Sequence, residues 1–245
     1  DERLRGPAEI FARAVGTLTG TAPAVTTRTA KNAVTLRLAP GFDTEEYLLE
    51  VTKRGVAVTA STPQAVLHGL RSLQQLIGDG EIPACIIRDK PVFAYRGAML
   101  DVCRHFFPVE DIKTYIDILS LHKINKFHWH LTDDQGWRIE IRKYPRLTEI
   151  GSKRSETLVG RYDKNRKGVY DGKPYGGFYT QDDIREVVEY ARALHIEVIP
   201  EIEMPGHSEE VLAVYPELSC SGKPYTDSDF CIGNDCLLYT SDAAD

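Results

Sequence analysis

The sequence feature that most constrains the fold is a β/α unit between residues 96 and 137. Strand-like apolar runs at 97–102 and 126–131 flank a segment, 108–122, whose apolar residues recur at steps of three and four. This spacing predicts one amphipathic helix. A strand, a helix and a second strand in this order predict two adjacent parallel strands. Functional side chains gather just past the carboxyl ends of such strands, in open sheets and in closed barrels alike.

The alternation of strand and helix returns later in the chain. Thr180 is a suitable N-cap for a second helix, and the run at 197–204 then predicts a third strand. The fold class is therefore α/β. Polar residues follow each of the three predicted strands, and they are the first candidates for a site: Arg104, Asp133 and His207.

Residues 1–92 predict a separate α/β unit. It begins with a helical pattern that Gly16 is expected to end. Strand-like runs follow at 34–38, 47–51 and 56–60, and a helix is then predicted from Pro63 to Ile77. No cluster of catalytic residue types occurs in this unit. We therefore expect two domains, 1–92 and 93–235, with the chemistry in the second.

Charge and apolar content argue against two classes of partner. The net charge of −6 comes from charges of both signs mixed along the chain, so no basic patch predicts nucleic-acid binding. No apolar run approaches the length of a membrane span. No leader precedes Asp1, which fits a removed signal peptide and a fragment equally well. The sequence carries no signal for an oligomeric state.

The last ten residues, 236–245, fit no element of this pattern. The string CLLYTSDAAD reads like the translation of a transposon-end adapter used to prepare sequencing libraries. We therefore expect the natural sequence to stop at Asp235 or shortly before, which would remove Cys236. In an exported protein Cys220 and Cys231 would then suit a loop disulfide, and two free buried thiols are the alternative.

Three motifs in this order resemble a known family: LDVCRHFF (100–107), KFHWHLTDDQGW (126–137) and PEIEMPGH (200–207). They are similar to motifs in the catalytic barrel of the glycoside hydrolase family 20 β-N-acetylhexosaminidases. Residues 1–92 resemble the family's small non-catalytic α/β companion domain. The resemblance implies that this companion domain is followed by an incomplete (β/α)8 TIM barrel, since eight strands are needed for closure.

The resemblance also implies an activity. Family 20 enzymes hydrolyse terminal non-reducing N-acetylhexosamine, GlcNAc or GalNAc, from β-linked glycans, and the substrate's own 2-acetamido group is the nucleophile. The mechanism retains configuration and needs no metal or cofactor. It does need an adjacent Asp-Glu pair at the end of the fourth barrel strand, and the only such pair here is Asp1-Glu2. The chain by itself is therefore expected to be inactive, and the parent protein to be exported.

Motif by motif, the resemblance assigns roles to four residues. Arg104 corresponds to the arginine that binds hydroxyls of the terminal sugar, and a planar guanidinium suits two adjacent hydroxyls. Asp133 and His207 correspond to the catalytic carboxylate–histidine pair that reaches towards the Glu of the Asp-Glu pair. Glu203 is a candidate for substrate binding and stands where many relatives have Asp. Aromatic residues of the long connection at 144–179 are expected to form a rim that stacks on the sugar, and a mobile loop is the alternative.

Other interpretations of these residues stay open. One alternative is that Arg104 is only a salt-bridge partner of Asp101 or Glu110. Another is that Asp133 and His207 form an ordinary buried hydrogen-bonded pair without a catalytic role. A rival enzyme class is a metal-dependent TIM-barrel hydrolase, because His128 and His130 have the HxH spacing of a metal-binding strand. A third class is a non-catalytic carbohydrate-binding barrel that has lost its acid.

Overall fold

The computed structural model describes residues 1–245 except 29, 79–80, 162–166, 225–226, 228 and 232–245. The segment predicted to be foreign, 236–245, lies outside the described residues. The chain divides into two compact units. Unit 1 comprises Asp1–Gly97, Tyr115–Lys126 and Tyr190–Glu197, and unit 2 comprises Ala98–Thr114, Phe127–Glu189 and Val198–Asp245.

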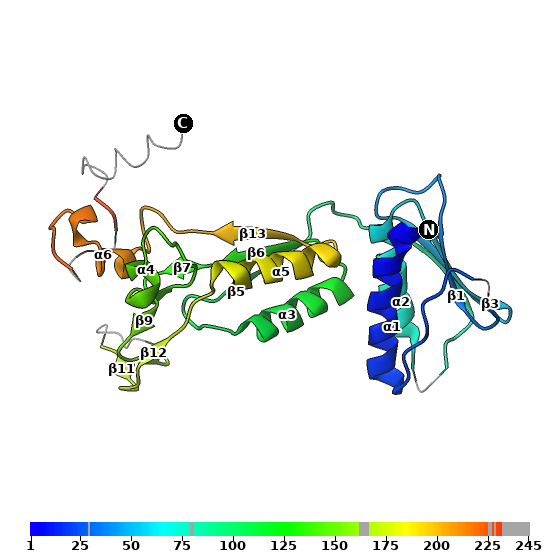
Figure 1. Cartoon of the computed structure of the whole chain (residues 1–245), viewed down its shortest axis with the longest axis horizontal. Coiled ribbons are helices and arrows are strands. Elements are labelled where there is room, and N and C mark those ends of the chain that lie inside the picture. The colour runs from blue at the N-terminus through cyan, green and yellow to red at the C-terminus, as the bar shows by residue number, and fades with distance from the viewer. Residues whose placement is uncertain (29, 79–80, 162–166, 225–226, 228, 232–245) are drawn as a thin grey trace. The chain divides into compact units, whose positions relative to one another are not determined.

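A four-stranded sheet and two helices form the first part of unit 1 (Figure 1). The elements are η1 Glu2–Leu4, α1 Arg5–Thr19, β1 Val34–Leu38, β2 Tyr47–Thr52, β3 Gly55–Ala60, α2 Pro63–Leu76 and β4 Cys85–Asp89. The strands follow the order β1-β3-β2-β4, with β1 parallel to β3 and the other neighbours antiparallel. Apolar side chains of the helices and the sheet form one buried core, which includes Phe11, Tyr47, Leu49, Val58, Val66, Leu70 and Leu73.

Two local details of this part differ from the prediction. Helix α1 continues past Gly16 and ends at Thr19, where Gly20 adopts the left-handed φ of 77° that closes a helix. A glycine within a helix costs only about 1 kcal/mol, which the buried side chains of the same helix offset. Strand β4 was not predicted. For α2 the expected cap is confirmed, because the Thr62 side chain accepts a hydrogen bond from the Ala65 N–H.

Three strands, β5 Gly97–Asp101, β6 Lys126–His130 and β13 Glu197–Glu201, form the second sheet in the order β13-β6-β5. The backbone hydrogen bonds show that β5 and β6 are parallel. The Lys126 N–H donates to the Arg96 carbonyl where both strands begin, and the Val102 N–H donates to the His130 carbonyl where both end. The same pattern links β6 to β13, so all three carboxyl ends lie at one edge.

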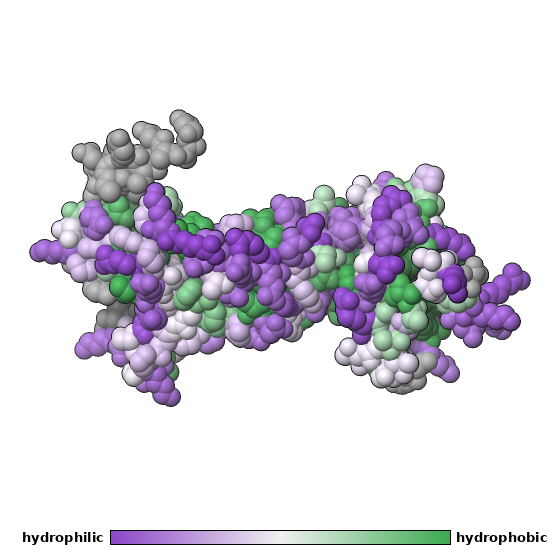
Figure 2. Space-filling view, viewed as in Figure 1, coloured by the Kyte–Doolittle hydropathy of each residue, from purple (hydrophilic) through white to green (hydrophobic). Residues whose placement is uncertain are grey.

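Helices α3 Val109–Leu121 and α5 Gln181–Ala193 connect these strands and lie side by side on the sheet (Figure 1). An ion pair joins Lys113 to Glu186, and the Tyr190 hydroxyl donates to Asp117. Hydrophilic residues cover the exposed side of α5 (Figure 2), as an amphipathic helix requires. Within the described residues every helix is too short or too polar to cross a bilayer.

The third strand is shorter than predicted, because it ends at Glu201 and not at Met204. The last ladder bond runs from the Leu131 N–H to the Glu201 carbonyl. Beyond it, the Glu203 N–H donates to the hydroxyl of Thr132 at 2.8 Å. After Glu201 the backbone therefore leaves the sheet and bonds to a side-chain acceptor. The alternation of polar and apolar residues that predicts a strand nevertheless continues to residue 204.

The chain after β6 contains short elements, and all but the first two lie in the segment 144–179, where the sequence predicts an irregular loop. They are β7 Thr132–Asp133, β8 Gly136–Trp137, α4 Arg146–Glu149, β9 Lys153–Arg154, β10 Leu158–Val159, β11 Val169–Tyr170 and β12 Tyr175–Gly176. The strands pair antiparallel as β7–β8, β9–β12 and β10–β11. Two-residue strands are too short to show alternation, so no period marks them in the sequence.

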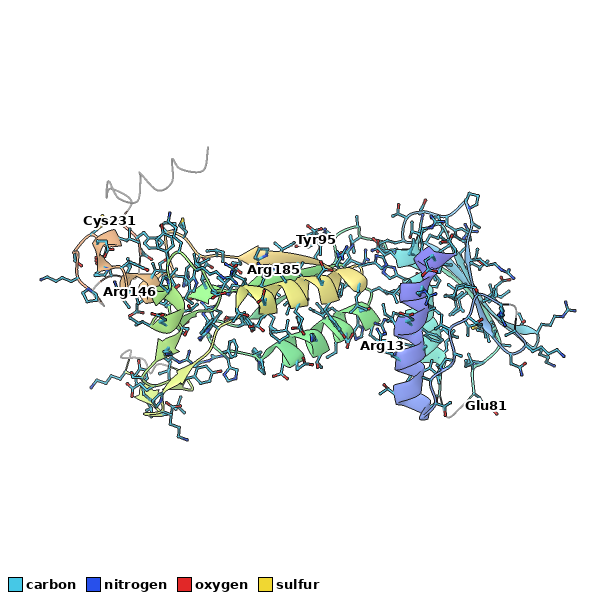
Figure 3. All side chains as sticks on the ribbon, in the orientation of Figure 1. Arg13, Glu81, Tyr95, Arg146, Arg185 and Cys231 are labelled. Carbon is cyan, nitrogen blue, oxygen red and sulfur yellow. A yellow bond between two sulfur atoms is a disulfide. The ribbon has the colours of Figure 1, made fainter. Side chains whose placement is uncertain are left out.

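After β13 the chain forms α6 Glu209–Leu212 and η2 Pro216–Leu218. Cys220 and Cys231 form a disulfide with a Cα–Cα distance of 4.7 Å, so the disulfide interpretation is confirmed over two free thiols. Cys231 lies beside the segment that follows α6 (Figure 3). Of the other described cysteines, Cys103 is buried and Cys85 is half-buried, and both are free thiols.

Replacing both disulfide cysteines by Ser is expected to lower the free energy of unfolding by about 2 to 3 kcal/mol. The reason is that a cross-link over a sequence separation of 11 residues limits the freedom of the unfolded chain. Urea unfolding followed by circular dichroism measures the change, with the free thiol Cys85 replaced by Ser as the control. A double variant with an unchanged unfolding midpoint would contradict this expectation.

Candidate active site

The candidate site lies past the carboxyl ends of β5, β6 and β13, where parallel strands place functional groups. Arg104 follows β5, Asp133 lies in β7 directly after β6, and His207 follows β13. The sequence predicts that these three residues share one site. The structure brings their charged groups together around one carboxylate.

That carboxylate belongs to Asp133, which is fully buried. Its Oδ2 lies 2.5 Å from Nη2 of Arg104, and its Oδ1 lies 3.2 Å from Nδ1 of His207. Oδ1 also accepts a hydrogen bond from the Asp134 N–H at 2.7 Å. A buried carboxylate is stable only when cations and donors compensate it, and Asp133 has both.

Arg104 is held by three oxygen atoms and leaves part of its guanidinium open. Besides the ion pair with Asp133, its Nη1 donates to Asp101 at 2.8 Å and its Nε donates to the Gln135 side-chain oxygen at 3.0 Å. The side chain is 45% exposed. Arg104 therefore does pair with Asp101, as the salt-bridge interpretation expects, but its guanidinium also reaches Asp133. The guanidinium N–H groups that are left over are available to a ligand.

Asp101 is the residue that fixes the loop carrying Arg104. Its Oδ1 accepts the N–H groups of Cys103 and Arg104 at 2.9 and 3.2 Å. Burial raises the pKa of the Asp101 carboxyl, but the hydrogen bonds from Arg104 and from these backbone groups outweigh burial and leave the pKa below its usual value. Asp101 is therefore an anion in the working range of pH.

His207 is the most exposed member of the cluster and has a strained backbone. Its φ is 54°, in the left-handed region, and its side chain is 55% exposed. The Asp134 carboxylate lies 3.5 Å from the same Nδ1 atom that contacts Asp133. The negative charge of Asp133, with smaller effects from Asp134 and Glu203, raises the pKa of His207 above its usual value.

The raised pKa can be measured on the full-length protein. An NMR titration of the imidazole C2 proton is expected to give His207 a pKa above about 6.5, and Asp133→Asn is expected to lower it. The His207–Asp133 pair then stabilises the folded protein fully at pH values below the pKa that His207 has in the unfolded chain. This stabilisation is lost as the pH rises through the pKa that His207 has in the folded protein. His195, whose pKa burial lowers, serves as the internal control. If the pKa of His207 lies at or below that of His195, the assignment is wrong.

Glu203 borders the cluster on the side of β6. Its Oε1 lies 3.6 Å from Nε2 of His130, and the same ring nitrogen lies 3.3 Å from Oδ2 of Asp133. Burial, followed by the neighbouring Glu201 carboxyl, raises the pKa of Glu203. Glu203 thus lies beside the cluster and is linked to Asp133 through the buried ring of His130, and its binding of substrate stays a prediction.

The two histidines of the HxH pair have different surroundings. His128 Nε2 lies 2.6 Å from the Glu201 carboxylate, whereas the ring of His130 is buried and faces Asp133 and Glu203. Among the described residues, three groups of side chains have the spacing of a metal site, and none of them contains His128. Both rings lie near Glu201 Oε2, since Nδ1 of His130 is 3.9 Å from it, but no group with metal spacing among these residues holds the two histidines together.

Two aromatic residues of the connection, Tyr175 and Tyr179, pack inward, and the stacking rim stays a prediction for the others. Tyr179 is fully buried and its hydroxyl donates to the Phe107 carbonyl at 2.6 Å. The Tyr175 hydroxyl donates to the Phe106 carbonyl and accepts the Phe106 N–H. These rings therefore support the loop after β5. Phe178 and Tyr170 are exposed, and Tyr162 lies outside the described residues.

Two residues that contact Arg104 or its loop have roles that the motifs alone did not predict. The side-chain oxygen of Gln135 accepts the Nε–H of Arg104. Arg138 donates to the carbonyl of Cys103, the residue that precedes Arg104. Both lie within or directly after the DDQGW string, so their position beside Asp133 was the only available signal. A fully buried arginine is unusual enough that burial, and not pattern, identifies it.

Comparison with known protein families covers both parts of the chain. Residues 93–243 match the model of the glycosyl hydrolase family 20 catalytic domain, and residues 1–90 match the model of glycosyl hydrolase family 20, domain 2. The first match includes most of the segment 236–245. That this segment is foreign stays a prediction.

Curated relatives and solved structures agree with these matches. The chain is 45% identical to a beta-hexosaminidase of Porphyromonas gingivalis in an alignment 221 residues long, which covers 82% of this chain and 27% of that protein. A beta-hexosaminidase of Vibrio furnissii is 44% identical over 190 residues, 75% of this chain and 30% of that protein. The chain thus spans about three-tenths of the length of these relatives.

Among solved structures, a mutant Streptomyces plicatus beta-hexosaminidase in complex with its product GlcNAc superposes with a TM-score of 0.84 at 37% identity. The match covers 97% of this chain and 48% of that one. A family 20 exo-β-N-acetylglucosaminidase from Vibrio harveyi, in complex with N-acetylglucosamine, gives a TM-score of 0.84 at 31% identity over 99% and 39% of the two chains. The chain therefore belongs to glycosyl hydrolase family 20.

Proposed function

We propose that the full-length protein, meaning this chain with whatever its gene encodes on either side, is a β-N-acetylhexosaminidase. It removes terminal non-reducing GlcNAc or GalNAc from β-linked glycans with retention of configuration. The observation that carries the proposal is the buried Asp133 carboxylate between Arg104 and His207, in a chain of family 20. Relatives that carry the name beta-hexosaminidase support it.

Each of the three residues has a distinct part in this proposal. The free N–H groups of Arg104 bind hydroxyls of the terminal sugar, and the acetamido oxygen of the substrate attacks its anomeric carbon. The required acid is a Glu from outside this chain, and it protonates the leaving oxygen. His207, held by Asp133, orients that Glu and tunes its proton affinity. Glu203 supports the Asp133 end of the sugar pocket through His130.

The barrel and its boundaries belong to the same proposal. We take β5, β6 and β13 as the first three strands of a (β/α)8 barrel that begins near residue 93, after a companion domain at 1–92. A parallel sheet that is covered by helices on one face supports this. The catalytic Asp-Glu pair would follow the fourth strand, so this chain alone is expected to hydrolyse nothing.

We also propose that the protein is exported. The Cys220–Cys231 disulfide supports this, because disulfides persist in oxidising compartments and are rare in the cytosol. A fusion of the full-length gene to a reporter that is active only outside the cytoplasm tests the proposal. Activity confined to the cytosol, with both thiols reduced, would contradict it.

Hydrolysis of three chromogenic substrates tests the function. The gene is recovered from intact genomic DNA with its flanking sequence, and the purified protein is assayed with the 4-nitrophenyl β-glycosides of GlcNAc, GalNAc and glucose. The two acetamido sugars are expected to be cleaved and the glucoside is not, because it lacks the internal nucleophile. An NMR time course is expected to show the β-anomer of the free sugar first.

The same protein separates the rival functions. Equal cleavage of the glucoside, or an activity that chelation removes and a divalent metal restores, would favour the metal-dependent class over the proposal. Binding of GlcNAc without hydrolysis, together with loss of the Glu from the downstream Asp-Glu pair, would indicate the carbohydrate-binding class. This chain without its flanking sequence is the matched inactive control.

A further inference from the structure

Arg138 is a fully buried arginine that has no carboxylate partner among the described residues. Each of its guanidinium N–H groups is matched by a backbone carbonyl instead. The Nε donates to Val102 at 3.1 Å, Nη1 donates to Ser152 and Gly177 at 2.7 and 2.9 Å, and Nη2 donates to Cys103 and Gln135 at 2.6 and 3.4 Å. A guanidinium has five donors, so its capacity is fully used. A neutral apolar residue would fill the same space without burying a charge.

The carbonyls that Arg138 contacts belong to the segments that hold Arg104. Cys103 directly precedes Arg104, and the Gln135 side chain accepts the Nε–H of Arg104 at 3.0 Å. The Ser152 and Gly177 carbonyls anchor the long connection beside the same loop. Arg138 thus links the loop after β5, the β7–β8 hairpin and the connection through one rigid, planar group.

The surroundings of the guanidinium keep it in this position. A Cβ atom on Gly136 would lie 2.5 Å from Cζ of Arg138, so the absence of a side chain there makes room for the group. The Phe106 ring lies 6.0 Å from the same carbon. A second arginine, Arg154, shares the Gln135 carbonyl with Arg138, to which it donates at 3.2 Å, and it donates to the Arg104 carbonyl at 3.0 Å.

We propose that Arg138 is a positioning residue that sets the place of the Arg104 guanidinium and thereby the affinity for the sugar. The proposal rests on the function proposed above and adds a residue outside the Arg104–Asp133–His207 cluster. Arg138 does not touch substrate. It acts on Arg104 through the Cys103 backbone and through Gln135, and a misplacement of about 1 Å in such a group can cost on the order of a hundredfold in rate.

Two variants of the full-length protein displace the guanidinium in different ways. Arg138→Lys keeps the charge but offers at most three donors from one point, so it cannot serve the separate carbonyls. Gly136→Ala keeps Arg138 and pushes the far end of its side chain with a methyl group. Both are expected to lower kcat/KM for 4-nitrophenyl β-GlcNAc by about 10- to 100-fold. Arg142→Lys, at an exposed arginine nearby, is the matched control and is expected to change nothing.

A double-mutant cycle with Arg104→Ala distinguishes positioning from general support of the fold. If Arg138 acts through Arg104, Arg138→Lys costs much less activity when Arg104 is already Ala. Binding of GlcNAc, measured by calorimetry on the same proteins, follows the same pattern and needs no hydrolysis. Full additivity, or folded Arg138→Lys and Gly136→Ala proteins with unchanged kcat/KM and affinity, would overturn the proposal. If the wild-type protein binds GlcNAc but does not hydrolyse the substrate, only the proposed enzyme function is contradicted. If it neither binds GlcNAc nor hydrolyses the substrate, the enzyme function and the positioning role of Arg138 are both overturned.

Discussion

Asp133→Ala is expected to lower the free energy of unfolding of the full-length protein by about 2 to 3 kcal/mol, because Arg104, His207 and the Asp134 N–H all lose the carboxylate that they contact. Asp133 is fully buried and its carboxylate lies 2.5 Å from Arg104 and 3.2 Å from His207. Without it, the buried ring of His130 also loses the oxygen that lies 3.3 Å from its Nε2. Urea unfolding followed by circular dichroism measures the loss.

An exposed aspartate gives the matched control for this change. Asp182 lies in the first turn of α5 and its side chain is 82% exposed. Asp182→Ala is expected to cost about 1 kcal/mol or less, since it removes only a surface ion pair and a helix-end charge. If Asp133→Ala costs no more than this, the carboxylate is not the electrostatic centre of the site. Asp133→Asn, which keeps the shape, then separates charge from packing.

Arg104→Ala is expected to reduce kcat/KM for 4-nitrophenyl β-GlcNAc by about 2 to 4 kcal/mol of transition-state stabilisation, which is about 30- to 1,000-fold. The loss arises because charged hydrogen bonds to the sugar hydroxyls disappear. Part of the guanidinium is already engaged by Asp101 and Gln135, so the group is oriented before substrate arrives. Steady-state kinetics on the folded variant measures the effect.

Two further variants make this result specific. Arg104→Lys keeps the charge but loses the planar fork, and it is expected to recover only a small part of the activity. Arg142→Ala removes an arginine whose side chain is 63% exposed and which lies outside the cluster, and it is expected to leave kcat/KM unchanged. A folded Arg104→Ala protein with wild-type kinetics would remove Arg104 from the site.

The β/α unit could be predicted from the sequence because periodicity reports which face of an element is buried. Helix α3 and strands β5 and β6 lie within about one residue of the predicted bounds. The end of β13 could not be predicted, since the Glu203 N–H leaves the ladder for the Thr132 hydroxyl and no pattern encodes that choice. The short strands between residues 152 and 177 were missed for a similar reason, because two residues cannot express a period.

The meeting of Arg104, Asp133 and His207 could be predicted because each residue follows one of three parallel strands whose carboxyl ends share an edge. What periodicity could not supply is the support around them. The five carbonyl contacts of Arg138 cross between loops, and the inward packing of Tyr179 depends on the loop after β5. Such contacts depend on tertiary geometry, and the composition of a loop carries little information about it.

The oxygen atoms around Arg104 also set a rule for inhibitors of the full-length protein. The guanidinium is bordered by the carboxylates of Asp101 and Asp133 and by the amide oxygen of Gln135, and its open N–H groups can only donate. A compound that presents two neighbouring acceptor oxygens to this edge matches it. A compound that presents an ammonium group there faces the one permanent cation of the cluster, and moving the amine to the opposite end of the scaffold removes that repulsion.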